Sequence, residues 1–138
     1  QSLLEPSTVE LDPRQLELVE SQADAISATG FLVEQFGGQS VLVRGVPAML
    51  ESGDPAEALA DVLDLMAEAG GFESWEERAA YSVACHSSIR AGKTLTFEEM
   101  TELARQLEEC EQPNTCPHGR PTMVHLSSGQ LEREFGRR

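Results

Sequence analysis

Two residue types that ligate metal ions stand close together in the stretch NTCPHGRPT, residues 114–122. Cys116 and His118 are separated by one residue, and Pro117 and Pro121 flank the pair. A thiolate and an imidazole are preferred ligands of zinc, and prolines stiffen a loop so that it loses less entropy on binding. The pattern therefore indicates a metal-binding loop. A proline-rich loop whose histidine caps a backbone carbonyl is the alternative, and spacing alone leaves both interpretations open.

A further cysteine, Cys85, lies in SVACHSSIRAG, where the residue spacing predicts a helix. On a helix it shares one face with Tyr81 and Ile89. A free cysteine is usually a small buried core residue, and the periodicity alone favours that interpretation over a ligand. His86 points about 100° away around the helix axis, so we expect it to be solvated or to cap the helix.

Other side chains near the C-terminus are basic. Arg120, Arg137 and Arg138 could hold a phosphate beside a metal loop, because a guanidinium matches a phosphate bidentately. Without a metal they would be solvated surface charges. Nucleophilic catalysis by a Cys/His pair lacks a visible third group to orient it, and there is no glycine-rich phosphate loop.

The first residues, QSLLEP, form a short segment with a glutamine, two adjacent leucines and a proline. Such segments dock in extended form into grooves of partner proteins, here with Leu3 and Leu4 as two hydrophobic anchors between Gln1 and Pro6. An ordinary first β-strand is the alternative, and the pattern alone favours the strand.

The composition limits the class of function. The 138 residues carry a net charge of −14, with 6 Lys/Arg and 22 Asp/Glu in residues 1–115 against 4 and 2 in residues 116–138. An acidic body repels phosphate backbones, so the chain is a poor candidate for a free-standing nucleic-acid binder, and a basic partner or another domain would have to hold any DNA. No run approaches the roughly 18 apolar residues of a membrane span. Three cysteines are an odd number, which indicates a reducing, cytoplasmic setting rather than a disulfide framework.

Local signals predict an α+β fold that is rich in helix in its middle. Asp-Pro pairs at residues 12–13 and 54–55 and the capping box TFEE start helices, and glycines end them. The capping-box helix should turn Met100, Leu103 and Leu107 inward. A hairpin is expected around Gly37-Gly38. The expected helices run from about 12 to 30, 54 to 70, 74 to 91, 96 to 111 and 127 to 135, and a strand is expected over 122–126.

Taken together, these pieces resemble the C-terminal domain of the MutL family of mismatch-repair proteins. The stretch ACHSSIRAGKTLTFEEMTELARQLEECEQPNTCPHGRPT resembles the part of the family that carries an A-C-[R/K]-like motif and the C-P-H-G-R-P motif. LEREFGRR resembles the closing F-x-R motif, and QSLLEP resembles the family's motif for binding the replicative sliding clamp. The resemblance is fullest from Ala84 to Arg138, and C-P-H-G-R-P is its most specific motif.

The resemblance implies a metal-dependent endonuclease domain that nicks the strand to be repaired, binds zinc or manganese, forms a homodimer and is stimulated by the sliding clamp. Matched position by position, it makes Cys85, Cys116 and His118 metal ligands. Partners expected through the full-length protein are the mismatch-recognition protein MutS and DNA, with ATP bound by another domain, and no membrane is expected. The alternative is a non-catalytic dimerisation and clamp-docking module with structural zinc or no metal.

The remaining matched positions would support the site. The resemblance gives this role to Arg120, Phe135 and Arg137. At the middle motif His86 stands where the family often has Arg or Lys, so its role stays open. The family's first motif, D-Q-H-A-x-x-E-x-x-x-x-E, is absent. We therefore expect a fragment that holds half a site and is inactive alone.

The resemblance also divides the chain. Residues 1–115 are expected to form a regulatory subdomain that is mostly helical with a small sheet. Residues 116–138 are expected to form part of an α/β dimerisation subdomain, whose strand over 122–126 should pair with another chain.

Overall fold

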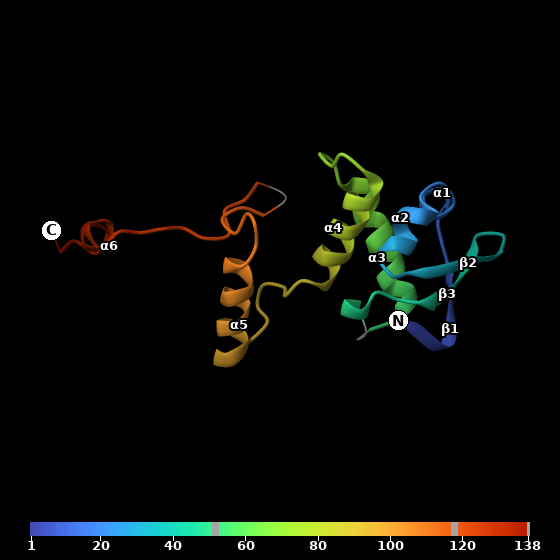
Figure 1. Ribbon diagram of the computed structural model, residues 1–138, viewed down its shortest axis with the longest axis horizontal. Helices are drawn as coiled ribbons and strands as arrows, with labels where there is room; N and C mark the ends of the chain where they lie inside the picture. The colour runs from blue at the N-terminus through green and yellow to red at the C-terminus, as the bar shows by residue number, and fades with distance from the viewer. Residues whose placement is uncertain (51–52, 117–118, 138) are drawn as a thin grey trace. The chain divides into compact units, whose positions relative to one another are not determined.

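The computed structural model describes residues 1–50, 53–116 and 119–137. Contacts between residues divide the chain into two compact units, Gln1–Arg90 and Ala91–Arg138. The elements of both units are labelled in Figure 1. Each unit is described here by itself. This division by contacts follows Arg90, while the functional division after residue 115 stays a prediction.

The first unit contains a three-stranded antiparallel sheet in the order β1-β3-β2, formed by Ser2–Glu10, Leu32–Gly37 and Ser40–Gly45. Strands β2 and β3 form the expected hairpin. Gly38 and Gln39 form the turn between them, and Gly37 and Gly38 have φ values of +119° and +60°, which L side chains rarely adopt. The sequence prediction of this hairpin is confirmed.

Helices follow the expected start signals. Asp12 begins α1 (Pro13–Ser21), and its side chain accepts a hydrogen bond from Gln15 N at 2.8 Å. Asp54 begins α3 (Pro55–Glu68) in the same way, accepting from Ala56 N at 2.9 Å. Each bond satisfies a backbone donor that the first helical turn leaves unpaired, which is why aspartate is favoured there.

The single helix expected between residues 12 and 30 is wrong in one respect. The chain leaves helical geometry at Gln22, where φ is −120° and ψ is 30°, so that α1 is followed by a separate α2 (Ala23–Ala28). The break turns Ala25 and Ile26 of α2 into the core, where both are buried. Packing therefore overrode a helical periodicity that ran through the break.

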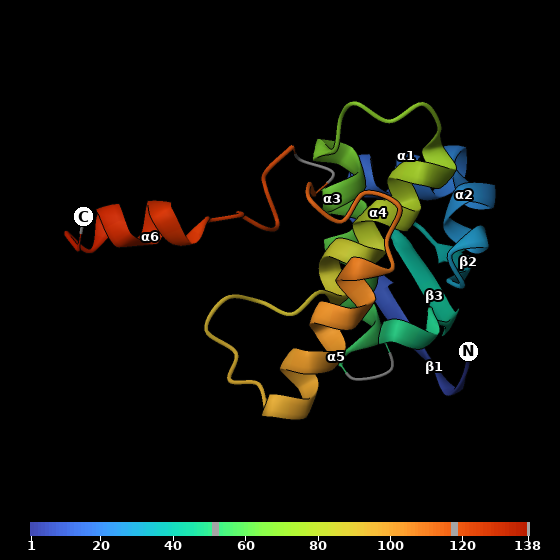
Figure 2. The ribbon, with the colours of Figure 1, turned by 60° about the vertical axis from the view of Figure 1, so that its left-hand side comes forward.

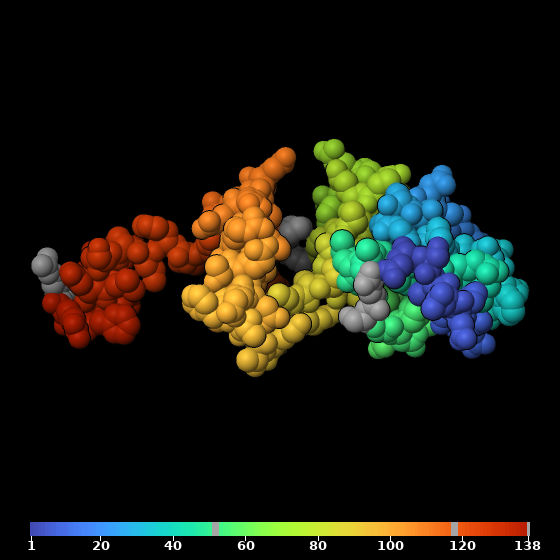
Figure 3. Space-filling view, turned by 60° about the horizontal axis from the view of Figure 1, so that its bottom comes forward, coloured from blue at the N-terminus to red at the C-terminus, as the bar shows by residue number. Residues whose placement is uncertain are grey.

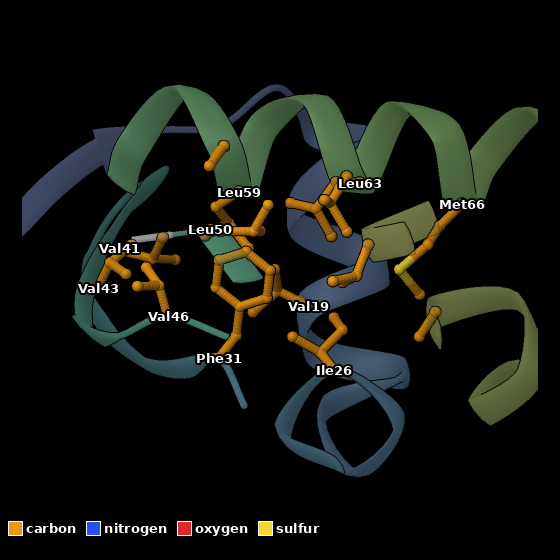
Figure 4. Close-up of a cluster of buried hydrophobic side chains, with 14 of the residues drawn as sticks. Val19, Ile26, Phe31, Val41, Val43, Val46, Leu50, Leu59, Leu63 and Met66 are labelled. Carbon is orange, nitrogen blue, oxygen red and sulfur yellow. The ribbon is translucent and has the colours of Figure 1, made fainter. Parts of the chain in front are cut away.

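The core of the first unit lies between α3 and the sheet. Figure 4 shows Leu59, Leu63 and Met66 pointing from one face of α3 toward Phe31 and Ile26. All five side chains are buried. Full burial of one such side chain is worth about 1.5–3 kcal/mol, so this cluster dominates the stability of the unit.

The last long helix of the first unit is α4 (Trp75–Ser87), which the sequence placed over residues 74–91. Ser74 caps it by accepting from Glu77 N at 3.1 Å. The guanidinium of Arg78 lies 4.4 Å from the centre of the Trp75 ring. Ser82 is fully buried and donates to the carbonyl of Arg78 at 2.8 Å, so its hydroxyl is satisfied inside the core.

The second unit holds α5 (Phe97–Glu108) and α6 (Ser128–Glu134), each begun by a capping box as expected. No described residue of this unit is buried. Met100 and Leu103 are 48% and 44% exposed, which corrects the expectation that α5 turns them inward. An amphipathic helix hides its apolar face only where another element covers it.

The strand expected over residues 122–126 is also wrong. Most of this segment has no regular secondary structure, and among the described residues near it the one strand-like pairing is an isolated bridge between Thr115 and Pro121. A strand is defined by its hydrogen-bonded neighbour, and no other described segment of this unit supplies one. β-favouring side chains alone therefore did not make this segment a strand.

The structure confirms the α+β fold class, with a helix-rich first unit and a small sheet. Among the described residues, no helix is both long and apolar enough to cross a membrane.

Candidate functional site

The candidate metal loop is held by backbone hydrogen bonds across its two limbs. Thr122 N donates to Asn114 O at 3.0 Å, and Cys116 N donates to Arg120 O at 2.9 Å. Gly119 N donates to Cys116 O at 2.9 Å. The loop is therefore a small hairpin that holds the backbone of Cys116 in place from local bonds alone.

Two residues of the motif have a clear backbone role. Gly119 has a φ of +80°, a conformation that is strained for any residue with a Cβ atom. Thr122 donates its side-chain hydroxyl to the carbonyl of Pro113, which ties the end of the hairpin to its start. The glycine and threonine of HGRPT thus shape the loop, whatever its ligands do.

Of the two ligands predicted in this loop, the structure describes Cys116. The Cys116 side chain is partly exposed, so an ion could reach it. His118 lies outside the described residues, and its assignment as a ligand stays a prediction. Within the part of the chain that the structure describes, no three His, Cys, Asp or Glu side chains come together as a metal site would require.

Cys85 lies on α4 in the first unit and is partly buried. It is therefore neither the fully buried core residue that periodicity favoured nor a fully solvated thiol. Because Cys116 belongs to the second unit, a site shared by the two cysteines stays a prediction.

His86 is not solvated as the sequence analysis expected. Its side chain is 20% exposed, and its Nδ1 lies 3.4 Å from Asp61 Oδ2 of α3. That nitrogen is buried and has no hydrogen-bond partner among the described residues. The packing of α4 against α3 causes this burial. Asp61 was missed by sequence reasoning, because no sequence signal says which residue of one helix faces a given residue of another.

The closing F-x-R motif coincides with the end of α6. Arg137 N donates to Glu132 O at 2.8 Å and Gly136 N donates to Arg133 O at 3.0 Å, with Gly136 at a φ of +64°. These bonds form a Schellman cap, which needs glycine at its left-handed position. Phe135 is 78% exposed. The cap fixes the backbone between Phe135 and Arg137, and the support role predicted for both side chains is left open.

The other predicted support residue, Arg120, sits on the returning limb of the hairpin. Its backbone carbonyl accepts the bond from Cys116, and the residue is exposed. The Arg120 guanidinium is therefore accessible to solvent, and the residue follows Cys116 by four positions in the chain.

The candidate clamp-binding segment begins at the edge of the sheet. The ammonium group of Gln1 donates to Val46 O at 2.8 Å, and Ser2 is paired with Gly45. The register then shifts, and pairing resumes only at Ser7. Figure 3 shows this first strand, in dark blue, on the surface of the first unit.

The two leucines of that segment differ in environment. Leu3 is partly buried and packs against the core, while Leu4 is fully exposed. Pro6 lies in the unpaired part of β1, where its missing N–H costs no ladder bond. The segment is therefore both an edge strand and a presented peptide, so the two alternatives from the sequence are compatible.

Charged groups on α5 bond to one another on an exposed surface. The pKa of Glu99 is lowered, first by the backbone N–H of Thr96, which donates to Glu99 Oε2 at 2.7 Å, and then by the Thr96 hydroxyl. The pKa of Glu102 is lowered first by Arg105, whose own pKa is raised first by Glu102. These contacts join residues of the same helix and its N-cap.

Comparisons with known proteins agree over nearly all of the chain. The family described as "MutL C terminal dimerisation domain" matches residues 1–95. The DNA mismatch repair protein MutL of Phenylobacterium zucineum is 45% identical over 141 residues, covering 100% of this chain and 23% of that protein. The MutL of Acidiphilium cryptum is 44% identical over 140 residues, covering 99% and 24%. The chain thus spans about a quarter of the length of the curated relatives it matches.

Proposed function

The chain belongs to the family of MutL C terminal dimerisation domains, and on that basis we propose that it forms part of a metal-dependent DNA-nicking endonuclease in mismatch repair. The observation that carries the proposal is the hydrogen-bonded hairpin around Cys116, which holds a soft ligand in a pre-formed loop. Pre-formed loops bind ions more tightly because less backbone entropy is lost.

The residues that would hold the ion are Cys85, Cys116 and His118. A thiolate and an imidazole suit zinc, while manganese prefers carboxylates, so this donor set favours zinc over manganese. When bound, such an ion polarises a phosphoryl oxygen and lowers the pKa of a bound water.

The role we assign to Arg120 is to bind a backbone phosphate beside the loop. A guanidinium makes two parallel hydrogen bonds to a phosphate, and this side chain is exposed. The acidic residues 1–115 repel DNA, whereas residues 116–138 hold 4 Lys/Arg and 2 Asp/Glu. DNA would therefore approach this chain at its C-terminal segment.

The site as described needs further ligands. The 138 residues contain no D-Q-H-A-x-x-E-x-x-x-x-E motif, and the described residues hold no cluster that could bind a metal by itself. Aligning a water against a phosphodiester calls for carboxylates around a catalytic cation. We therefore propose that this chain alone does not nick DNA.

Elemental analysis after dialysis against a weak chelator tests the metal site. We expect zinc to be bound by this chain and lost in Cys116→Ala. Cys110→Ala is the matched control, because Cys110 is an exposed cysteine of the same unit outside the motif. Equal metal content in both variants would show that Cys116 is not a metal ligand.

Nicking is tested separately on supercoiled plasmid with Mn²⁺. We expect no nicking by this chain, because it lacks the D-Q-H-A-x-x-E-x-x-x-x-E motif whose carboxylates would hold the catalytic cation. Nicking that survives purification and is abolished by Cys116→Ala would contradict the half-site proposal.

A second function is favoured by the exposure of Leu4. We propose that the segment of Gln1, Leu4 and Pro6 docks into a groove of the sliding clamp, with Leu4 as the apolar anchor. Leu4→Ala should abolish clamp binding measured by surface plasmon resonance. Phe36→Ala changes another exposed apolar side chain, on β2 outside the segment, and should leave clamp binding unchanged. Loss of binding in both variants would mean that the clamp is bound through nonspecific apolar contacts and not through this segment.

We also propose that the chain forms a homodimer, as the description of its family indicates. Apolar side chains at Phe97, Met100 and Leu103 are exposed along α5, and such a face is stabilised when a second copy covers it. Sedimentation velocity tests this proposal. MutS and DNA are partners proposed for the full-length protein.

A further inference from the structure

A groove of about 640 Å³ runs through the first unit between the α1–α2 pair and β2. Its floor is apolar and includes Val19, Ile26 and Phe31, which belong to the core. Figures 1 and 2 both show α2 beside β2, so the two elements are neighbours from either direction. None of the residues assigned to the metal loop or to clamp docking lines this groove.

The groove follows the outer edge of β2. Residues 31–35 line it consecutively, whereas a groove on one face of a strand would be lined by alternate residues. β2 is the last strand of the sheet and pairs only with β3 among the described residues. Its other edge therefore presents backbone N–H and C=O groups that can pair with an added strand.

The rim of the groove is acidic. Glu20, Asp24 and Glu34 line it with one basic side chain, Arg44. Arg44 Nε already donates to Glu34 Oε2 at 2.8 Å. Asp24 has no hydrogen-bond or ion-pair partner in the part of the chain that the structure describes. The groove thus carries negative charge that is not neutralised locally.

One side chain crosses the groove. Gln35 Nε2 donates to Glu20 Oε1 at 2.7 Å, at an exposed position. A cationic side chain from a ligand would be a stronger donor to the same carboxylate, because charge-assisted hydrogen bonds are stronger than neutral ones. The hydrogen bond of Gln35 to Glu20 can therefore be replaced by a cationic side chain of a ligand, so Gln35 does not prevent a ligand from entering the groove.

We propose that this groove binds an extended basic segment of a partner protein. The main chain of the segment adds to the free edge of β2. Its apolar side chains pack over Leu32 and the core floor, and its Lys or Arg side chains pair with Glu20 and Asp24. Main-chain bonds supply the affinity and the alternating pockets supply the selectivity. The proposal does not depend on metal binding or DNA nicking.

The test uses the 138-residue chain labelled with ¹⁵N and a short synthetic peptide of alternating arginine and valine. We expect the peptide to shift the amide signals of residues 20–27 and 31–35. A peptide of alternating glutamate and valine should not bind. An arginine–valine peptide with every second amide N-methylated should bind more weakly, because methylation removes the main-chain donors.

Charge-reversal variants provide the matched control. Glu20→Lys should weaken binding of the arginine–valine peptide by about threefold or more, as expected for partly exposed charge pairs. Glu17→Lys carries the same change of charge on the same helix but lies outside the groove, so its affinity should stay within about twofold of the parent chain. Gln35→Ala should bind at least as tightly as the parent.

Three results would overturn the proposal. Equal weakening by Glu17→Lys and Glu20→Lys would mean that net charge, and not the groove, attracts the peptide. Equal affinity of the N-methylated peptide would rule out strand addition. Shifts of residues 20–27 and 31–35 on concentrating the chain alone, without any on adding peptide, would mean that a second copy occupies the groove.

Discussion

At the scale of single residues, the two cysteines of the second unit have the same side chain but different local structure around them. Cys110 lies beyond the end of α5, and its thiol donates to the carbonyl of Gln106 at 3.3 Å. Cys116 instead follows the first limb of a hydrogen-bonded hairpin and accepts through its carbonyl from Gly119. The sequence motif singles out the second cysteine, and the hairpin gives a physical reason for it.

Gly119→Ala should open the hairpin. Its φ of +80° is strained for alanine, and the strain costs about 1–2 kcal/mol. We expect weaker metal binding and faster amide exchange at Cys116 and Thr122. Gly129→Ala is the control, because Gly129 lies in α6 at an ordinary helical φ. That variant should stabilise α6 by about 0.5–1 kcal/mol and leave metal binding unchanged. Similar metal losses in both variants would contradict the backbone role of Gly119.

At the scale of elements, helix α5 shows the limit of what local signals can do. Its capping box pairs Thr96 with Glu99 in both directions, with bonds of 2.7 and 3.2 Å. Its apolar face is exposed all the same. Caps determine where a helix starts, whereas the partner that covers a helix comes from elsewhere.

Thr96→Ala should loosen α5, because the cap is worth about 1 kcal/mol. Amide hydrogen exchange along α5 measures the effect. Thr94→Ala changes an exposed threonine outside the helix and should leave the exchange rates unchanged. If the two variants behave alike, the capping box does not hold α5.

The same helix should respond to acid. The folded pKa of Glu99 lies below its ordinary value of 4.5, so its contribution to helix stability is complete above that value. It is lost as the pH falls through the lower folded pKa. We expect α5 exchange to accelerate in that window in the parent chain, and the acceleration to be smaller in Glu99→Gln. An equal acid response in both would assign the effect to other carboxylates.

At the scale of the whole molecule, the buried hydrophobic residues of the described chain all lie between Leu11 and Val83. The first unit therefore carries the cooperative stability of the described structure. The second unit has capped helices and a hydrogen-bonded hairpin but no buried side chain among its described residues. We therefore expect the tertiary order of the second unit to depend on a partner that covers its exposed apolar side chains.

A chain that ends after Arg90 should keep the cooperative denaturant-unfolding transition of the first unit. Leu63→Ala should destabilise both the short and the full chain by about 2–5 kcal/mol, because it leaves a cavity in the core. Leu4→Ala should change the free energy of unfolding little, since Leu4 is fully exposed. Denaturant unfolding followed by circular dichroism measures all three. A short chain that unfolds without a transition would show that the second unit supports the core.

Much of the fold was predictable because its signals are local. The Asp-Pro helix starts at Asp12 and Asp54, the capping box at Thr96 and the glycine hairpin at Gly37 each depend on neighbours in the chain. The Cys116 loop belongs with them, because Gly119 and backbone hydrogen bonds between residues close in the chain shape it. For the same reason the sequence by itself singled out the loop as the candidate site.

The tertiary structure decided whatever depends on distant partners. It broke the first helix at Gln22, buried His86 beside Asp61, and left residues 122–126 without a strand. It also placed α2 beside the free edge of β2, which created the acidic groove. None of these features has a local signal, because each is set by which surfaces of distant segments meet and by the apolar area that they bury.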